Sequence, residues 1–447
     1  MGASLSCGYG SKVLPLHGQG SYSVGCADMM VKDGPNGDTG IFMRIYYPVD
    51  NKDIDENQKE EDYALWIPRK EYLQGLAASM KIPTWRLQLI SDWVIGEKRM
   101  PALWERPLSG SKLPMHQVAS SFSMDDFAMA ADPSFKPRKF PTSLSMQSFS
   151  QQTFPVIVFS HGLSGARFMY STYCASLASY GFVVAAVEHR DFSSCWTYKM
   201  VPDPLDGRYK EKEVMMRILN PNENEVKVRV PQLHKRVSEM VKALHLLEEL
   251  NLGLIGARGE KSQRIVVGEH FNWRQFKGRL DLSRAAAVGH SFGGATALGA
   301  TAFSTDFQAA VVWDGWMLPV EEQMYERFTQ PTLFLNSGSW QWRKNVDKML
   351  KVDRCERTLF TFLNTTHQAF SDFSHLLRNQ YLAKRMGFIG ETDGQLVGEA
   401  VVEMTICFLR KTFEAGPSQL VVRQMAKERY PFVIEGTNVR NEIPPKL

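Results

Sequence analysis

The sequence lacks several features that mark special classes of protein. No run of about 18 consecutive apolar residues occurs, so we expect no membrane-spanning helix. The amino terminus has no apolar segment typical of a secretory signal, so we do not expect export. The six cysteines are scattered and include no C-x-x-C pair, which favours free thiols over a disulfide framework. No block of Lys and Arg stands out, so nothing indicates a nucleic-acid partner.

What the sequence contains is the composition of an ordinary globular protein. Its 447 residues are 44% hydrophobic and 22% charged, and 52 basic residues against 48 acidic ones leave a net charge of +4. This composition excludes a disordered or collagen-like chain and allows one large domain or two smaller ones. The 21 Met and 10 Trp are less ordinary, because both side chains suit surfaces that meet lipid as well as protein cores.

The amino terminus carries the pattern of a lipidation signal. After removal of Met1, Gly2 followed by Ser6 matches an N-myristoylation substrate. One myristoyl chain binds membranes only reversibly, and Cys7 stands where a palmitoyl group could add a second anchor. We therefore expect a cytoplasmic protein that associates reversibly with membranes through acylation of Gly2, with Cys7 as a further candidate.

The chain divides into an arm, a main domain and a tail. Residues 1–25 are rich in Gly and Ser and are expected to form a flexible arm. Residues 26–430 are expected to form a single domain, interrupted at about 105–153 by a surface insertion rich in Ser, Pro and Met. Residues 431–447 are expected to form a C-terminal tail. The sequence contains no internal repeat.

The main domain shows short apolar runs that alternate with helical patterns. Apolar spacing predicts helices over 167–180 and 232–250 and from about Gly293 onward. The strand-like runs are Ile41–Tyr47 (which Pro48 should end), Phe154–Ser160, Phe182–Val187, Ala285–Gly289, Ala309–Trp313, Thr332–Asn336 and Leu359–Leu363. This alternation predicts an α/β fold, in which a mostly parallel central sheet is covered by helices on both faces.

One motif points to a nucleophile. Gly289-His290-Ser291-Phe292-Gly293 is a G-x-S-x-G sequence between a predicted strand and a predicted helix. In that context the serine occupies a sharp turn, where small neighbours avoid clashes and the helix N-terminus favours developing negative charge. Ser291 is therefore the candidate nucleophile.

A nucleophilic serine needs a histidine that accepts its proton. In this architecture the histidine follows the serine, and only His367 and His375 do so. His367 lies in a loop just past a predicted strand, whereas His375 is expected within the next helix. We therefore favour His367 as the base.

The histidine in turn needs a carboxylate that orients it. Asp314 directly follows the run Ala309–Trp313, at the carboxyl end of that strand, where catalytic groups collect in open α/β sheets. Asp306 precedes the same strand and Asp372 follows the histidine, so both fit poorly. We favour Asp314 as the acid.

A developing oxyanion needs two main-chain N–H donors. Residues 159–165 follow a predicted strand and contain the His-Gly form of an oxyanion loop. We expect the N–H groups of Leu163 and Phe292 to be the donors, with His161 as a structural member of the loop. Because amides would stabilise the oxyanion, we expect no metal ion, calcium or other cofactor.

A stretch ahead of the insertion could meet lipid. Residues 82–102 place Trp85, Leu89 and Trp93 on one helical face and interleave them with basic residues, which is typical of a helix in the plane of a membrane. A helix packed into the core would show the same spacing. Both interpretations stay open at this point.

Taken together, the motifs resemble the platelet-activating-factor acetylhydrolases, which are calcium-independent serine phospholipases A2 of the α/β-hydrolase fold. The resemblance extends from about residue 20 to 415. Its blocks are FSHGLSGARFMYS (159–171), LASYGFVVAAVEHRD (177–191), AAVGHSFGGATA (286–297), VVWDGWMLP (311–319) and THQAFSDF (366–373). The lipidation signal is similar to that of the intracellular member of the family. The long insertion, residues 336–342 and Gly315, where the family usually has Ala, depart from its pattern.

The resemblance implies hydrolysis of platelet-activating factor, and of phospholipids with short or oxidised sn-2 chains, at a membrane surface. It implies the triad Ser291, Asp314 and His367 and the oxyanion donors Leu163 and Phe292, in agreement with the choice made from the residues. Three alternatives remain: a carboxylesterase for soluble esters, a transacetylase that passes the acyl group to a lysolipid, and a catalytically silent lipid-binding protein. The last would normally have lost a triad residue, and none is lost. The oligomeric state has no signal in the sequence.

Overall fold

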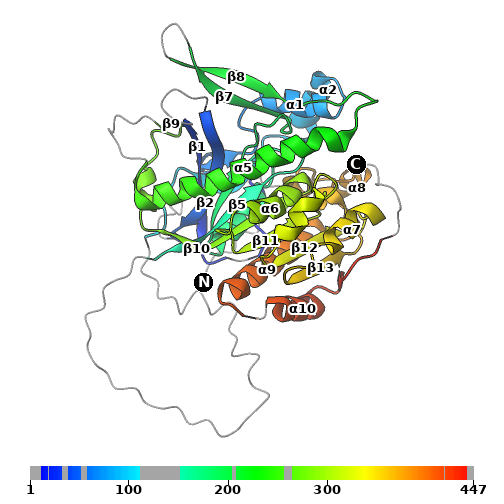
Figure 1. Cartoon of the computed structure of the whole chain (residues 1–447). Helices are drawn as coiled ribbons and strands as arrows, with labels where there is room; N and C mark the ends of the chain where they lie inside the picture. The colour runs from blue at the N-terminus through cyan, green and yellow to red at the C-terminus, as the bar shows by residue number, and fades with distance from the viewer. Residues whose placement is uncertain are drawn as a thin grey trace, which may run out of the picture.

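The structure is a computed structural model, and it describes residues 12–18, 20–32, 39–51, 58–110, 152–203, 208–255, 264–416 and 418–439. Gly2 and Cys7 of the predicted lipidation signal lie outside the described residues, as does most of the predicted insertion at 105–153. The described part of the chain is built around one twelve-stranded sheet and a separate two-stranded sheet (Figure 1).

Six parallel strands form the centre of the large sheet, in the order β13-β12-β11-β10-β5-β6. They are β5 (Phe154–Ser160), β6 (Val183–Val187), β10 (Leu280–His290), β11 (Ala309–Trp313), β12 (Thr332–Ser337) and β13 (Arg357–Phe362). Most of their residues are buried, because parallel strands are covered on both faces, and this produces the continuous apolar runs of the sequence. The predicted mostly parallel α/β sheet is confirmed.

Antiparallel and short strands extend the sheet on both sides. Beyond β6 come β2 and β1 in antiparallel pairing, then β4 parallel to β1, and β3 at the edge; β9 also pairs with β1, and β14 pairs with β13 at the other edge. The bounds are β1 (Ser23–Lys32), β2 (Thr39–Val49), β3 (Tyr63–Leu65), β4 (Arg99–Trp104), β9 (Ile265–Val267) and β14 (Val433–Glu435).

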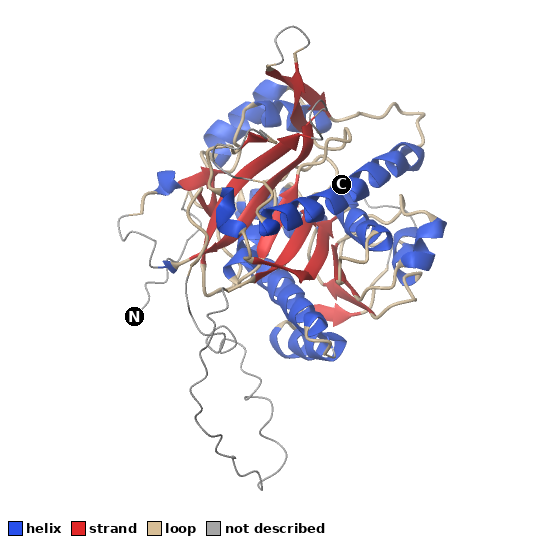
Figure 2. Cartoon of the chain, turned by 60° about the vertical axis from the view of Figure 1, so that its left-hand side comes forward, coloured by secondary structure: helices blue, strands red, loops and turns tan. Residues whose placement is uncertain are grey.

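Helices cover both faces of the sheet (Figure 2). Their bounds are α1 (Glu71–Ser79), α2 (Thr84–Ile90), α4 (Ser171–Ser179), α5 (Glu225–Leu252), α6 (Phe292–Phe303), α7 (Arg343–Leu350), α8 (Gln380–Arg385), α9 (Gly394–Phe413) and α10 (Ser418–Arg429). Helices α5 and α6 pack on one face of the central strands, and α4 and α9 pack on the other. Successive side chains of β10 point to opposite faces of the sheet. Ala286 and Val288 therefore pack into the hydrophobic core on one face, and Ala285 and Ala287 pack into the core on the other.

Several element boundaries differ from the sequence prediction, and a proline is involved at two of them. Strand β2 does not end before Pro48: this residue pairs with Val24, and its carbonyl oxygen still accepts a hydrogen bond from the N–H of Ser109. Helix α5 begins well before residue 232, because the side chain of Asn224 caps it and Pro231 is accommodated inside it. In both cases a proline that predicts a break lies inside the element.

A small layer lies at one end of the large sheet. The strands β7 (Trp196–Pro202) and β8 (Tyr209–Met215) form the two-stranded sheet, and α1 packs against β7 and α2 at the top of Figure 1. Among the described helices, none is both long enough and apolar enough to cross a membrane.

Candidate active site

The turn between β10 and α6 holds Ser291 in a strained conformation. Its φ of 57° and ψ of −122° lie outside the regions that most residues adopt, as a nucleophile on a sharp strand-to-helix turn requires. A Cβ atom on Gly293 would lie 2.0 Å from the carbonyl oxygen of Ser160, and one on Gly289 would lie 2.1 Å from the carbonyl oxygen of Gly293. Glycine alone fits at these two positions, which explains why the motif predicts the turn.

The candidate base and the candidate acid meet at the carboxyl ends of two later strands. Asp314 follows β11, and His367 begins the 3-10 turn His367–Phe370 after β13. The Nδ1 atom of His367 lies 2.8 Å from Oδ2 of Asp314, and both side chains are buried. An Nδ1–H that donates to the carboxylate leaves Nε2 as an acceptor, which is the tautomer that a general base requires.

Ser337 holds the Asp314 carboxylate from β12, the strand between β11 and β13. Its main-chain N–H donates to Oδ1 at 2.9 Å, and its hydroxyl donates to Oδ2 at 2.6 Å. Together with the bond from His367, these contacts fix the plane of the carboxylate and therefore the direction from which it meets the imidazole.

Two aromatic rings lie against the imidazole of His367. The ring centroid of Trp340 is 3.8 Å from that of His367, and the ring centroid of His290 is 4.4 Å from it. Burial lowers the pKa of His290 well below its usual range, and the neighbouring His367 lowers it further. His290 is therefore neutral in the folded protein, and the base is surrounded by uncharged rings.

The loop of residues 161–165, which follows β5, brings Leu163 beside the nucleophile turn. A Cβ atom on Gly162 would lie 3.2 Å from Cβ of Ser291, so the loop and the turn are in contact. Phe292 is the first residue of α6, where an N–H has no partner inside the helix. Within the part of the chain that the structure describes, neither this N–H nor that of Leu163 donates to another residue. Both are available to a negatively charged oxygen.

Arg236 on α5 supports the 161–165 loop from inside the protein. The side chain is fully buried, and its Nη1 donates to the carbonyl oxygen of His161 at 2.7 Å. Its Nε lies 2.9 Å from the hydroxyl oxygen of Ser193 and 3.2 Å from the carboxylate of Asp191, and the guanidinium lies 4.4 Å from the ring centroid of Phe292. Burial lowers the pKa of Arg236, and Asp191 opposes this effect. One buried cation thus contacts both segments that carry the candidate oxyanion donors.

The two other histidines considered in the sequence analysis, His161 and His375, have other partners than Asp314. His161 is buried in its loop, where its Nδ1 lies 2.8 Å from the carbonyl oxygen of Gly162 and its Nε2 accepts from the N–H of His189. His375 is buried beside His17, with ring centroids 5.0 Å apart, and burial lowers its pKa to about 4. Neither contacts Asp314.

Asp372 and Asp306, which the sequence analysis considered poor candidates for the triad acid, have other partners than His367. Asp372 is buried and accepts hydrogen bonds from the N–H and hydroxyl groups of Ser171 and Thr172, and from Nε1 of Trp66. It therefore fixes the start of α4. Asp306 is exposed at the far end of α6.

Three residues that shape the site were not singled out by the sequence as part of it: Ser337, Trp340 and Arg236. Ser337 and Trp340 have no local signal, because their contacts depend on how distant loops meet. Arg236 has one: it is a charged residue that shares the buried face of α5 with Leu233 and Met240. A buried charge on an apolar helix face requires a partner and indicates a specific role.

Three side chains at the centre are close enough to share a metal ion. One ligand atom each of His290, Asp314 and His367 lies within 4.8 Å of the others. The Nδ1 of His367 is already bonded to Asp314, and Nε2 of His290 lies 3.1 Å from the carbonyl oxygen of His367. These contacts suit a histidine base that a carboxylate orients better than they suit coordination of a metal ion.

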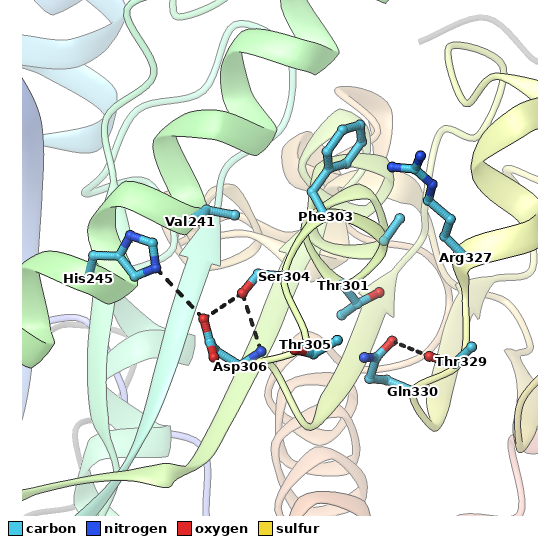
Figure 3. A pocket seen from close by; sticks show the side chains of 11 residues that line it. Val241, His245, Thr301, Phe303, Ser304, Thr305, Asp306, Arg327, Thr329 and Gln330 are labelled. Carbon is cyan, nitrogen blue, oxygen red and sulfur yellow. Dashed lines mark hydrogen bonds and ion pairs between the residues drawn. The ribbon is translucent and has the colours of Figure 1, made fainter.

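A separate surface concavity of about 510 Å³ lies at the other end of α6 (Figure 3). It is lined by residues of α5, of the α6 C-terminus and of the segment before β12, and among them Nε2 of His245 lies 3.7 Å from Oδ2 of Asp306. Ser291 precedes α6 and Ser304 follows it, so the concavity is about 18 Å from the nucleophile along a helix of this length. It is not part of the candidate active site.

The three residues predicted to face a membrane are exposed. The exposed fractions are 61% for Trp85, 48% for Leu89 and 84% for Trp93. Helix α2 has no buried residue, and it continues as a π-helical turn over Ser91–Ile95. The core-packed interpretation of this stretch therefore does not hold for these side chains. Trp66, which precedes the stretch, is buried instead.

The fold and the site together define an α/β-hydrolase: a mostly parallel sheet presents a serine on a strained turn and a His–Asp pair from later strands. Comparison with solved structures agrees, since the fold is similar to that of a ferulic acid esterase from Streptomyces cinnamoneus, with a TM-score of 0.55 and 14% identity over 95% of this chain and 98% of that one. The family described as platelet-activating factor acetylhydrolase, isoform II, matches residues 8–120 and 135–418. The chain belongs to this family and is an esterase-type hydrolase.

Curated relatives agree with this assignment. The chain is 32% identical to the platelet-activating factor acetylhydrolase of Canis lupus familiaris over 88% of its own length and 76% of the relative. It is 30% identical to the protein of that name from Gallus gallus, over 94% and 89%. A putative phospholipase A2 of Schizosaccharomyces pombe is 32% identical over 44% of this chain and 48% of its own.

Proposed function

We propose that this protein hydrolyses the sn-2 ester of platelet-activating factor and of phospholipids with short or oxidised sn-2 acyl chains. The products are acetate or a short fatty acid and a lysophospholipid. The observation that carries the proposal is the His367–Asp314 hydrogen bond, which lies against His290, the residue before the strained Ser291, in a chain whose curated relatives are named platelet-activating factor acetylhydrolases.

The proposed acylation step uses the triad in its usual roles. The Oγ atom of Ser291 attacks the sn-2 carbonyl carbon while Nε2 of His367 takes the hydroxyl proton. The imidazolium that forms donates from Nδ1 to the Asp314 carboxylate. The N–H groups of Leu163 and Phe292 bind the oxyanion of the tetrahedral intermediate, and one such donor contributes roughly 3 kcal/mol. The proton then passes to the lysophospholipid oxygen as it leaves, and an acyl-enzyme remains.

In the proposed deacylation step, water replaces the alcohol. His367 takes a proton from the water, whose oxygen attacks the acyl carbon, and the second tetrahedral intermediate collapses to the carboxylic acid and free Ser291. Every proton moves through His367, and the negative charge is stabilised by main-chain amides. The proposed chemistry therefore assigns no step to calcium.

Bulky aromatic rings on both sides of the site favour substrates with a short sn-2 acyl group. Trp340 lies against His367, and Trp316 packs against the ring of Phe292 with centroids 5.6 Å apart. Aromatic side chains beside the base and beside an oxyanion donor restrict the space for an acyl chain. We therefore expect kcat/KM to fall as the sn-2 chain lengthens.

The test is a panel of phosphatidylcholines with sn-2 chains from acetyl upward, assayed on wild type, Ser291→Ala and a control variant, Ser304→Ala. Ser304 lies at the opposite end of α6, so its loss should leave activity intact. We expect Ser291→Ala to be inactive and correctly folded. Retained turnover by Ser291→Ala would refute the mechanism.

The same panel separates the competing activities. Turnover of soluble short esters without any turnover of phospholipids would favour a carboxylesterase. Transfer of the acetyl group to added lysophospholipid, at the expense of free acetate, would favour a transacetylase. Activity that depends on added calcium, or is lost in EDTA, would contradict the proposed chemistry.

We also propose that the protein is cytoplasmic and binds membranes peripherally, through Trp85, Leu89 and Trp93 and through acylation of Gly2 and Cys7. The exposed side chains of α2 and the following turn support the first part. The acylation motif supports the second, and Lys12, which lies within the predicted arm, bonds through its carbonyl oxygen to the N–H of Arg99 in β4. Since β4 begins shortly after the exposed turn, both anchors would act at one region of the molecule.

A further inference from the structure

Three loops must meet at the active site, and one of them starts far away in the sheet. The nucleophile turn follows β10 and the 161–165 loop follows β5, its direct neighbour. The His367 loop follows β13, which is separated from β10 by β11 and β12 (Figure 1). Three strand spacings amount to about 14 Å, so the His367 loop has to reach back across the sheet.

A continuous chain of hydrogen bonds joins the loops that flank the nucleophile. The main-chain N–H of Gly162 donates to the phenol oxygen of Tyr170 at 3.1 Å. That oxygen lies 2.9 Å from Nδ1 of His290, and Nε2 of His290 lies 3.1 Å from the main-chain carbonyl oxygen of His367. Tyr170 and His290 are both buried, and neither side chain belongs to the triad.

Only one arrangement of protons satisfies every atom of this chain. The carbonyl oxygen of His367 can only accept, so Nε2 of His290 carries the hydrogen. His290 is neutral, because burial holds its pKa well below the usual range, so Nδ1 is bare and accepts the hydrogen of Tyr170. Burial also raises the pKa of Tyr170, so the phenol keeps its proton. The phenol oxygen then accepts the N–H of Gly162.

The packing around the chain leaves little freedom for the loop. A Cβ atom on Gly162 would lie 3.0 Å from the phenol oxygen of Tyr170 and 3.2 Å from Cβ of Ser291. The His290 ring is also stacked on Phe370 of the His367 loop, with an interplanar angle of 7°. The phenol thus sets how near the residue before Leu163 comes to the nucleophile.

We propose that Tyr170 and His290 are positioning residues that hold the oxyanion donor of Leu163 and the base His367 in register across the nucleophile turn. The proposal rests on the proposed function, since it assigns Leu163 and His367 their catalytic roles. Loss of the bridge lets the two loops move apart, which weakens oxyanion binding and proton transfer. Substrate binding in the ground state is not affected.

The first test is Tyr170→Phe, which removes one oxygen and keeps the ring. Its control is Tyr46→Phe, which removes the hydroxyl group of another buried tyrosine in the same core cluster. Within the described part of the chain, that hydroxyl donates a hydrogen bond only to the sulfur of Met100. We expect Tyr170→Phe to lower kcat for platelet-activating factor about 10- to 100-fold with little change in KM, as a displaced reacting group does. Phosphorylation of Ser291 by diisopropyl fluorophosphate, whose phosphoryl oxygen uses the same donors, should slow by a similar factor. The melting temperature should match that of the control.

The second test is His290→Phe, alone and combined with Tyr170→Phe. If the two residues form one bridge, the double variant loses little more activity than His290→Phe alone. Losses that multiply would overturn the proposal, as would a kcat for Tyr170→Phe equal to that of Tyr46→Phe. If Tyr170→Phe melts far below the control, the comparison of His290→Phe with the double variant decides. Turnover by Ser291→Ala would instead refute the proposed function, so the two failures are distinguishable.

Discussion

Ser337 donates both its main-chain N–H and its hydroxyl to the carboxylate of Asp314. The acid is therefore fixed by the strand that separates it from the base, and not by its own loop alone. A carboxylate held at both oxygens presents one defined edge to His367, which is what orients the imidazole toward the serine.

We expect Ser337→Ala to weaken catalysis without abolishing it. The hydroxyl is lost while the main-chain N–H remains, and a hydrogen bond to a charged group contributes about 1.5–3 kcal/mol, so kcat should fall roughly 10- to 100-fold. The control is Ser339→Ala, an exposed serine two positions later. Steady-state kinetics on both variants provide the measurement, and equal kcat values would show that the second bond is dispensable.

Gly293→Ala should damage the nucleophile turn and the fold together. A Cβ atom at this position would lie 2.0 Å from the carbonyl oxygen of Ser160, which is main chain and cannot rotate away. We expect a loss of roughly 2–4 kcal/mol in the free energy of unfolding and no measurable activity. Gly110→Ala is the matched control, because nothing lies within 4 Å of the added atom. Urea unfolding distinguishes the two, and wild-type stability in Gly293→Ala would contradict the observed packing.

Acidification should destabilise the protein in part through His375. Burial lowers the pKa of His375 to about 4 in the folded protein, whereas the unfolded value is about 6.5. Between these values the unfolded chain binds a proton that the folded protein excludes, so the free energy of unfolding falls as the pH drops below about 6.5. For this one residue the loss between pH 7 and pH 5 is about 2 kcal/mol.

His375→Phe removes that titration and keeps a ring beside His17, so its stability should depend less on pH over the same range. Urea unfolding at pH 7 and pH 5 measures the difference. His270→Gln, at an exposed histidine, is the control that should leave the wild-type slope unchanged. We also expect His375→Phe to retain esterase activity, since His367 and not His375 lies against Asp314. An inactive but folded variant would reopen the choice of base.

Trp93→Ser should reduce binding to phospholipid vesicles. The side chain is the most exposed of the three apolar residues on the α2 segment, and burying an aromatic ring in lipid contributes about 1.5–3 kcal/mol, so the partition coefficient should fall at least about 10-fold. Leu420→Ser is the control, because Leu420 is an exposed leucine of α10, and Figure 1 shows this helix at the opposite end of the molecule from α2. Sedimentation with vesicles gives the measurement, and equal partitioning of both variants would exclude α2 as the contact.

The central strands and the place of the nucleophile could be predicted because their signals are local. Gly289 and Gly293 are required by steric contact with neighbouring main-chain atoms, so the motif identifies the turn. Asp314 and His367 follow short apolar runs that favour buried strands, and chain order leaves few other choices. The structure brings these two residues within hydrogen-bonding distance.

Other parts had no signal that a single sequence could carry. Ser337 reaches Asp314 because of the register between β11 and β12, which no short motif encodes. Tyr170 and His290 form a hydrogen bond although they lie far apart in the chain. Pro48 misled the prediction of the end of β2, because tertiary pairing outweighs the local preference of proline to interrupt a strand. The apolar spacing that predicted a helix from residue 232 missed the earlier turns of α5, which the side chain of Asn224 caps and which contain Pro231.

The large sheet ends in two very short strands, β3 at one edge and β14 at the other, each of three residues. Exposed edges offer unpaired main-chain groups to other chains, and short edge strands limit that risk. Strand β14 shields β13, whose residues are almost all buried. We therefore expect the segment after α10 to limit self-association: a chain that stops before Val433 would present β13 as an open, apolar edge, and we expect it to aggregate.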